Sequence, residues 1–137
     1  MLKLEFSHTY SYRAETEGIS LPLVLRSGMR NAFLDAKIDS GASHCLFQRD
    51  HGEILGLDIE AGERKYFSTV TGPVETFGHV VQIETLGIAF DSMVYFFANA
   101  AINKSVLGRT GWLDRIRFGL VDYDQTLYLA PYDFESK

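Results

Sequence analysis

The chain has 137 residues, of which 46% are hydrophobic and 23% are charged, and its formal net charge is −5. This balance predicts one globular domain over residues 1–137, and the scattered basic residues on an acidic chain disfavour a nucleic-acid surface. A single cysteine excludes an internal disulfide, the start lacks the apolar core of a signal peptide, and no apolar stretch is long enough for a bilayer, so we expect a cytoplasmic protein with no membrane partner.

The first predicted elements form a hairpin. "GISLPLVLRSG" predicts a strand over residues 19–26, and Pro22 indicates an edge or the start of a strand. "SGMRN" is typical of a turn. Residues 32–39 then place alternate side chains on opposite faces, with the smaller apolar ones on one side. The second strand therefore runs directly into Asp39.

A helical segment and a second hairpin follow. "QRDHGEILGLD" after Phe47 predicts one or two helical turns that stop at Gly56. Residues 64–83 predict two strands rich in β-branched and aromatic side chains, joined at Thr71, Gly72 and Pro73. This hairpin separates the Asp39 segment from the rest of the chain.

The remaining elements are short strands. We expect separate strands at 87–90 and 92–102, a strand end, a glycine turn and a short helix within 105–115, and a closing hairpin from 115 to 132 around "DYDQ". Many short strands with little helix predict an all-β fold, as a small closed or orthogonally packed β-barrel.

Two short motifs carry the chemistry. Asp39, Ser40, Gly41, Ala42 and Ser43 follow the alternating strand, and the sequence Val-Leu-Gly-Arg at 106–109 lies beyond the second hairpin. An Asp-Ser-Gly triplet alone occurs by chance in many chains. The two motifs in this order, with a hairpin between them, resemble the retropepsins, the single-domain aspartic proteases of retroviral type and their cellular relatives. The resemblance extends from about Ile19 to Leu129.

The resemblance implies a retropepsin-type barrel with one short helix near the C-terminus, and the activity of an aspartic endopeptidase without cofactor or metal. In that family two aspartates hold a water that attacks a peptide bond, so Asp39 is implied as the acid and base. Ser40 is implied to bond across a dimer to the opposite loop. Gly41 lets a substrate backbone pass closely, and Ala42 keeps the floor of the site small.

The mechanism requires two aspartates, and the chain offers one suitable motif. Asp91 precedes a serine, but Met93 follows and does not allow a close backbone approach. We therefore predict a homodimer with one Asp39 from each subunit, acting on a peptide or protein substrate. The chain ends "MLKLEF" (1–6) and "TLYLAPY" (126–132) are the two candidates for the interface sheet.

Two features depart from the viral pattern. Thr71, Gly72 and Pro73 occupy the place of the flap tip, and one glycine with a proline predicts a stiffer tip. Ser43 stands where many viral members carry an acid that pairs with the arginine of the second motif. We expect Gly108 and Arg109 to brace the site, with Arg109 paired to Asp114 or another carboxylate.

Other functions remain open. The second hypothesis, after the protease, is a catalytically silent dimerisation or peptide-binding module with the same fold. A metal-dependent hydrolase using His44 and His51 is a weaker alternative, because their spacing matches no zinc signature. Cys45 has the surroundings of a small core residue, and neither Ser40 nor Ser43 lies in the Gly-x-Ser-x-Gly elbow of a serine nucleophile.

Overall fold

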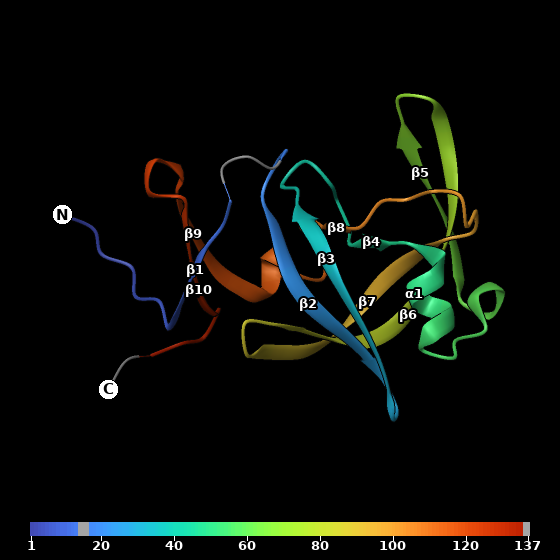
Figure 1. Cartoon of the computed structure of the whole chain (residues 1–137), viewed down its shortest axis with the longest axis horizontal. Coiled ribbons are helices and arrows are strands. Elements are labelled where there is room, and N and C mark those ends of the chain that lie inside the picture. Colours follow the sequence, from blue (N-terminus) through green and yellow to red (C-terminus); the bar gives the residue numbers. More distant parts are fainter. Residues whose placement is uncertain (14–16, 136–137) are drawn as a thin grey trace.

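The computed structural model describes residues 1–13 and 17–135, and in this part the chain is mostly β. A seven-stranded sheet has the order β2 (Ser20–Ser27), β3 (Arg30–Ile38), β8 (Val106–Leu107), β4 (Leu46–Phe47), β7 (Ile88–Phe97), β6 (Gly72–Thr85), β5 (Glu63–Thr69). A three-stranded sheet has the order β1 (His8–Ser11), β10 (Thr126–Pro131), β9 (Ile116–Val121). Helix α1 (Arg49–Ile54) and the 3-10 turns η1 (Ile59–Ala61), η2 (Leu113–Arg115) and η3 (Asp122–Asp124) lie between strands (Figure 1).

The seven-stranded sheet folds back on itself. Strand β2 pairs with β3 along its whole length and also with β6 through Val24, Leu25 and Arg26. This second pairing joins the two ends of the run from β2 to β6 and leaves β5 outside it. The enclosed side chains are apolar, since Leu21 and Leu25 on β2 are completely buried. Burial of these alternate residues is the main stabilising term of the fold.

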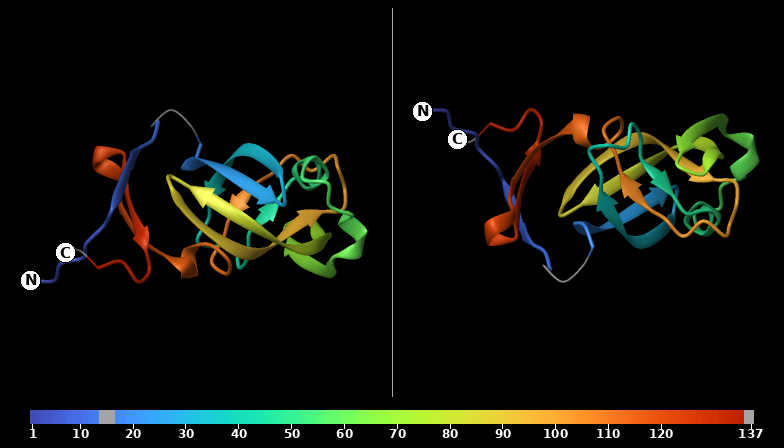
Figure 2. Two further views of the ribbon diagram at one scale, coloured as in Figure 1. Left: turned by 90° about the horizontal axis from the view of Figure 1, so that it is seen from below. Right: turned by 90° about the horizontal axis from the view of Figure 1, so that it is seen from above.

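The three-stranded sheet stands at one end of the molecule, close to both chain ends (Figure 2). Trp112, which is completely buried, joins it to the larger sheet. Its indole N–H donates to the hydroxyl of Thr85 on β6 (3.2 Å), and its ring lies 6.4 Å from that of Phe118 on β9. The single tryptophan therefore belongs to the core.

The predicted hairpins are confirmed. Strands β2 and β3 pair from Ser20 with Lys37 to Ser27 with Arg30, β5 pairs with β6, and β9 pairs with β10. The helical turns predicted after Phe47 form α1, and Gly56 follows it with a φ of +76°. None of the helices among the described residues is long and apolar enough to cross a membrane.

The expectation of a short helix near the C-terminus was wrong. The α-helix lies in the middle of the chain, and the segment after Arg109 forms only the three-residue 3-10 turn η2. Gly111, with a φ of +102°, precedes that turn, and the buried Ile116 already begins β9. Only residues 112–115 lie between these two points, which is about one turn and too short for an α-helix of several turns.

The two strands predicted at 87–90 and 92–102 are one strand, β7. It pairs with β6 without interruption, from Ile88 opposite Thr85 to Phe97 opposite Thr76. Continuous pairing explains why Asp91 does not break the strand. Tyr95, Phe96 and Phe97 near the end of this strand are buried and belong to the core.

Candidate active site

Asp39 directly follows the last residue of β3, which lies between β2 and β8 in the sheet. Ile38 pairs in parallel with Leu107, and the N–H of Asp39 donates to the Leu107 carbonyl (3.0 Å). The same ladder begins one step earlier, where the N–H of Lys37 donates to the Ser105 carbonyl (3.0 Å). The strand that leads into the first motif therefore pairs at its end with the backbone of the second motif.

The Asp39 loop (residues 39–44) turns immediately after the strand. The Ala42 N–H donates to the Asp39 carbonyl (3.1 Å), and the Gly41 N–H donates to Oδ1 of the Asp39 carboxylate (2.9 Å). The Asp39 side chain is half-buried, and no second donor reaches its carboxylate from the residues that the structure describes. The loop thus orients this carboxylate and leaves its other oxygen open to solvent or to a partner group.

Residues 108–110 clamp the Asp39 loop through the backbone. The Arg109 N–H donates to the Ala42 carbonyl (2.9 Å), and the Thr110 N–H donates to the Ser43 carbonyl (2.8 Å). Gly108 is buried so closely against the loop that an added Cβ would lie 2.1 Å from the carbonyl oxygen of His44. Only glycine allows this contact, which explains the glycine of the second motif.

The Arg109 side chain is exposed and is absent from the ion pairs of the described residues. The expected pairing of Arg109 with Asp114 is absent from the ion pairs of the described residues, and the Asp114 carboxylate accepts the N–H of Gly111 (3.0 Å). The bracing contact of Arg109 is made by its backbone.

A hollow of about 600 Å³ lies between the Asp39 loop and the segment after Gly108, lined by Ser40, Ser43, Arg109, Thr110, Leu113 and Asp114.

The β5–β6 hairpin occupies the place predicted for the flap, and Figure 1 shows it projecting on the side toward which β3 runs. Val70 and Thr71 form the turn, while Gly72 and Pro73 already belong to β6, opposite Thr69 and Ser68. The tip predicted at residues 71–73 therefore lies one to two residues further along the chain than the turn in the structure. Gly72 has a φ of +113°, a backbone conformation that favours glycine.

His44 ties the Asp39 loop to this hairpin. Its ring lies 5.3 Å from that of Phe67 on β5 and 5.4 Å from that of Tyr95 on β7, and those two rings are 5.3 Å apart. Burial, and then the nearby Lys65 ammonium, lower the pKa of His44 below its ordinary value, so the ring is neutral near pH 7. We call His44, Phe67 and Tyr95 the three-ring cluster.

From the sequence, His44 was a candidate only for metal binding, and its place in this cluster was not predicted. The alternation of side chains along β5 was the signal from which part of the cluster was predictable, because it places Lys65 and Phe67 on one face. His51 lies in α1, and burial lowers the pKa of its imidazole. In the part of the chain that the structure describes, no three His, Cys, Asp or Glu side chains are grouped to hold a metal.

Cys45 lies in the core. The side chain is completely buried, and burial raises the pKa of its thiol to about 12. A thiol that remains protonated and inaccessible is not a nucleophile.

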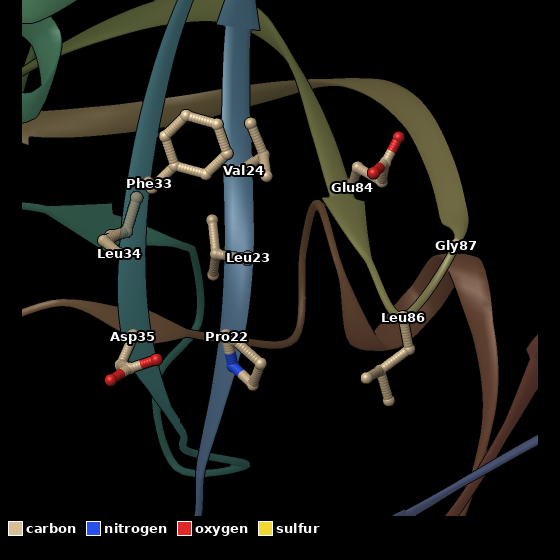
Figure 3. Close-up of a pocket in the computed structure, with 9 residues that line it drawn as sticks. All are labelled: Pro22, Leu23, Val24, Phe33, Leu34, Asp35, Glu84, Leu86 and Gly87. Carbon is tan, nitrogen blue, oxygen red and sulfur yellow. The ribbon is translucent and has the colours of Figure 1, made fainter.

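A second hollow, of about 580 Å³, lies on the outer side of the β2–β3 pair, next to the turn between β6 and β7 (Figure 3). Its apolar wall includes Pro22, Phe33 and Leu86, and Asp35 and Glu84 lie at its margin. None of the predicted site residues lines it.

No family model and no curated protein matches the sequence. Solved structures do match the fold. A retropepsin-like aspartic protease from Rickettsia conorii gives a TM-score of 0.67 at 15% identity, covering 93% of this chain and 96% of that one. The retroviral protease-like domain of Ddi1 from Leishmania major gives 0.58 at 16% identity, covering 87% and 98%. EIAV protease, in complex with an inhibitor, gives 0.56 at 21% identity, covering 73% and 88%. The resemblance inferred from the two motifs is confirmed at the level of the fold.

Proposed function

We propose, from the retropepsin-like fold of the chain, that it is an aspartic endopeptidase. The active unit is a homodimer, in which two Asp39 carboxylates, one from each subunit, activate a water molecule against a peptide bond.

The placement of Asp39 carries this proposal. The carboxylate stands at the end of a central strand, on a loop of small residues whose backbone is clamped by residues 108–110. A pre-organised acid in such a loop is the arrangement that proton transfer to and from a bound water requires. Ser40 and Gly41, both exposed, leave the approach to this acid open.

A second copy has to supply the second acid. Asp91 lies within β7, opposite Gln82 on β6, and not in a loop beside Asp39. A two-fold axis brings together identical residues that lie next to it, so the proposed dimer requires an axis beside Asp39 at which the two Asp39 side chains meet. The hydroxyl of Ser40 is exposed in the single chain and is available for the bond across the dimer that the resemblance implies.

The paired acids divide the chemistry between them. Two carboxylates in contact share one proton, because both do not ionise easily at short distance, as is general for aspartic proteases. The charged carboxylate removes a proton from the water as its oxygen attacks the peptide carbonyl. The neutral carboxyl donates a hydrogen bond to the oxygen that gains charge, and protonation of the amide nitrogen then releases the amine.

We place the dimer contact at the three-stranded sheet. Strand β10 is paired on both sides, by β1 and β9, so residues 126–131 have no free edge for a partner. The outer edges of β1 and β9 are unpaired within the described chain, and Leu120 and Val121 at the end of β9 are exposed by 44% and 41%. The segment before β1 also packs on this sheet, because the ring of Phe6 lies 5.8 Å from that of Tyr128 on β10, and the Arg117 side chain on β9 donates to the Glu5 carbonyl (3.2 Å). Unpaired edges with apolar side chains favour association.

The test compares the wild-type protein with Asp39→Asn. Casein and a peptide library are incubated with each between about pH 4 and pH 7, where a shared proton is expected, while sedimentation reports the mass of each. We expect cleavage only by the wild type and a dimer in both. Equal cleavage by both removes Asp39 from the chemistry. Dimers without any cleavage favour a silent peptide-binding module, and chelator-sensitive cleavage that survives Asp39→Asn favours the metal-dependent alternative.

A further inference from the structure

Strand β5 carries one cation on each of its two faces, and the two have different neighbours. Lys65 and Phe67 share one face by alternation, and this face is turned to the Asp39 loop because the Phe67 ring contacts His44. Arg64 lies on the opposite face. Its Nε is 3.2 Å from a carboxylate oxygen of Glu75, and its guanidinium lies 5.7 Å from the centre of the Phe77 ring.

Two aromatic rings lie near the Lys65 ammonium, and no carboxylate of the described residues pairs with it. Its ammonium lies 5.6 Å from the centre of the Phe67 ring and 5.9 Å from that of Tyr95. The ion pairs among residues 1–13 and 17–135 do not include Lys65, although Arg64 beside it is paired. Two aromatic faces hold the cation by cation–π attraction without neutralising it.

The surrounding charges leave Lys65 as the positive group on this face. His44 is neutral near pH 7, for the reasons given above. Glu63 lies on the same face of β5 as Lys65 by alternation, and its carboxylate and that of Asp114 act on His44, but neither forms an ion pair with Lys65. The inner face of the hairpin therefore combines aromatic side chains, the Glu63 carboxylate and an ammonium that is in no ion pair of the described residues.

We propose that Lys65, with the rings of Phe67 and Tyr95, forms a side-chain pocket that selects an acidic residue in the bound peptide. The inference rests on the proposed function, because it requires a peptide between the hairpin and the Asp39 loop. A glutamate side chain in this pocket pairs with the ammonium, whereas the isosteric glutamine cannot. Since the rings already restrain the lysine, less side-chain entropy is lost when the pair forms.

Positional-scanning peptide libraries with Glu, Gln or Lys fixed at one position measure this selection. We expect the wild type to cleave peptides with Glu at one position about fivefold faster than those with Gln, the scale of a partly exposed ion pair. Lys65→Met, which keeps the aliphatic stem over the rings, removes the preference, and Lys65→Arg retains it. Arg64→Met is the matched control, because it removes the neighbouring cation on the other face, and we expect it to leave the preference unchanged.

A binding measurement separates this inference from the protease proposal. The Asp39→Asn protein, with and without Lys65→Met, is titrated with fluorescent libraries of the same composition. Tighter binding of the Glu library that depends on Lys65 supports the acidic pocket even if no peptide is cleaved. Equal binding of the Glu and Gln libraries by Asp39→Asn, or a Glu preference that Lys65→Met leaves intact, overturns the pocket even if Asp39-dependent cleavage is found.

Discussion

The Asp39 loop and the β5–β6 hairpin are held in place in different ways. The loop is fixed by backbone hydrogen bonds to residues 107–110 and by the close contact of Gly108 with the His44 carbonyl. The hairpin has its own ladder, but its contact with the loop is made by side chains, through Phe67 and the two other rings of the three-ring cluster. Val70 at its turn is fully exposed.

Under the proposed function, this difference matches two demands, since the acid needs a fixed position and the hairpin needs to move. A catalytic acid depends on a fixed position, which backbone bonds and a buried glycine provide. A hairpin that admits and covers a peptide has to open, and the contacts of the half-buried rings of His44 and Phe67 with the buried Tyr95 are few enough to allow this. Substitutions in the two regions should therefore have different consequences.

Gly108→Ala should produce the largest effect. The added Cβ would lie 2.1 Å from a backbone oxygen, and backbone cannot rotate away as a side chain can. We expect a loss of roughly 3 kcal/mol in the free energy of unfolding, the upper range for overpacking, together with loss of activity. Thermal or urea unfolding measures it. Gly28→Ala is the control, because Gly28 has a φ of +57° but no atom within 4 Å, so only the backbone strain of about 1 kcal/mol is expected.

Phe67→Ala should weaken the hairpin and leave the loop intact. Loss of two aromatic contacts corresponds to about 1–2 kcal/mol of local stability. Amide hydrogen exchange in β5 is expected to accelerate while exchange of the Asp39 loop is unchanged. Tyr66→Ala, on the opposite face, is the comparison. A loop that exchanges faster in Phe67→Ala would contradict the separation of the two regions.

Gly72→Ala should have a smaller effect, restricted to the end of the hairpin. Its φ of +113° makes alanine strained, at a cost of about 1 kcal/mol, while the space around it is empty. We expect a higher KM for peptide cleavage and little change in the melting temperature. A melting temperature lowered as far as in Gly108→Ala would show that the hairpin supports the core.

The smallest expected effect is a pH dependence through His44. Burial lowers the pKa of this imidazole from its ordinary value of 6.5, so below that pH the unfolded chain binds the proton more readily than the folded one. Stability is therefore complete above pH 6.5 and decreases as the pH falls below it. His44→Phe keeps a ring and removes the titration, so its melting temperature should fall less steeply with acid. Equal slopes of melting temperature against pH for the two proteins would show that His44 does not contribute to the acid sensitivity. His51, whose pKa is also lowered, contributes to the slope of both proteins.

Local pattern predicted the parts that depend on neighbouring residues. The alternation before Asp39, the glycine after α1 and the paired segments around "DYDQ" each leave a signal within a few residues. The meeting of the Asp39 loop with residues 107–110 was expected only from the resemblance, since no local pattern connects segments so far apart in the sequence.

Long-range packing decided what the sequence did not reveal. Strand β1 exists because His8–Ser11 pairs with the distant β10, and its own residues carry no strong strand signal. The three-ring cluster unites residues from three separate segments. The C-terminal helix was mispredicted because η2 is limited by its neighbours, Gly111 and the start of β9, and not by its own helix propensity.

Subunit mixing tests the central claim most directly. Wild-type chains are mixed with an equal amount of Asp39→Asn chains and allowed to exchange subunits. The cleavage rate of the mixture is compared with that of wild-type protein alone at the total protein concentration of the mixture. If two Asp39 residues form one site, only dimers of two wild-type chains are active, and random exchange leaves about a quarter of the rate. A rate of one half, the value for chains that each act alone, would contradict the shared site.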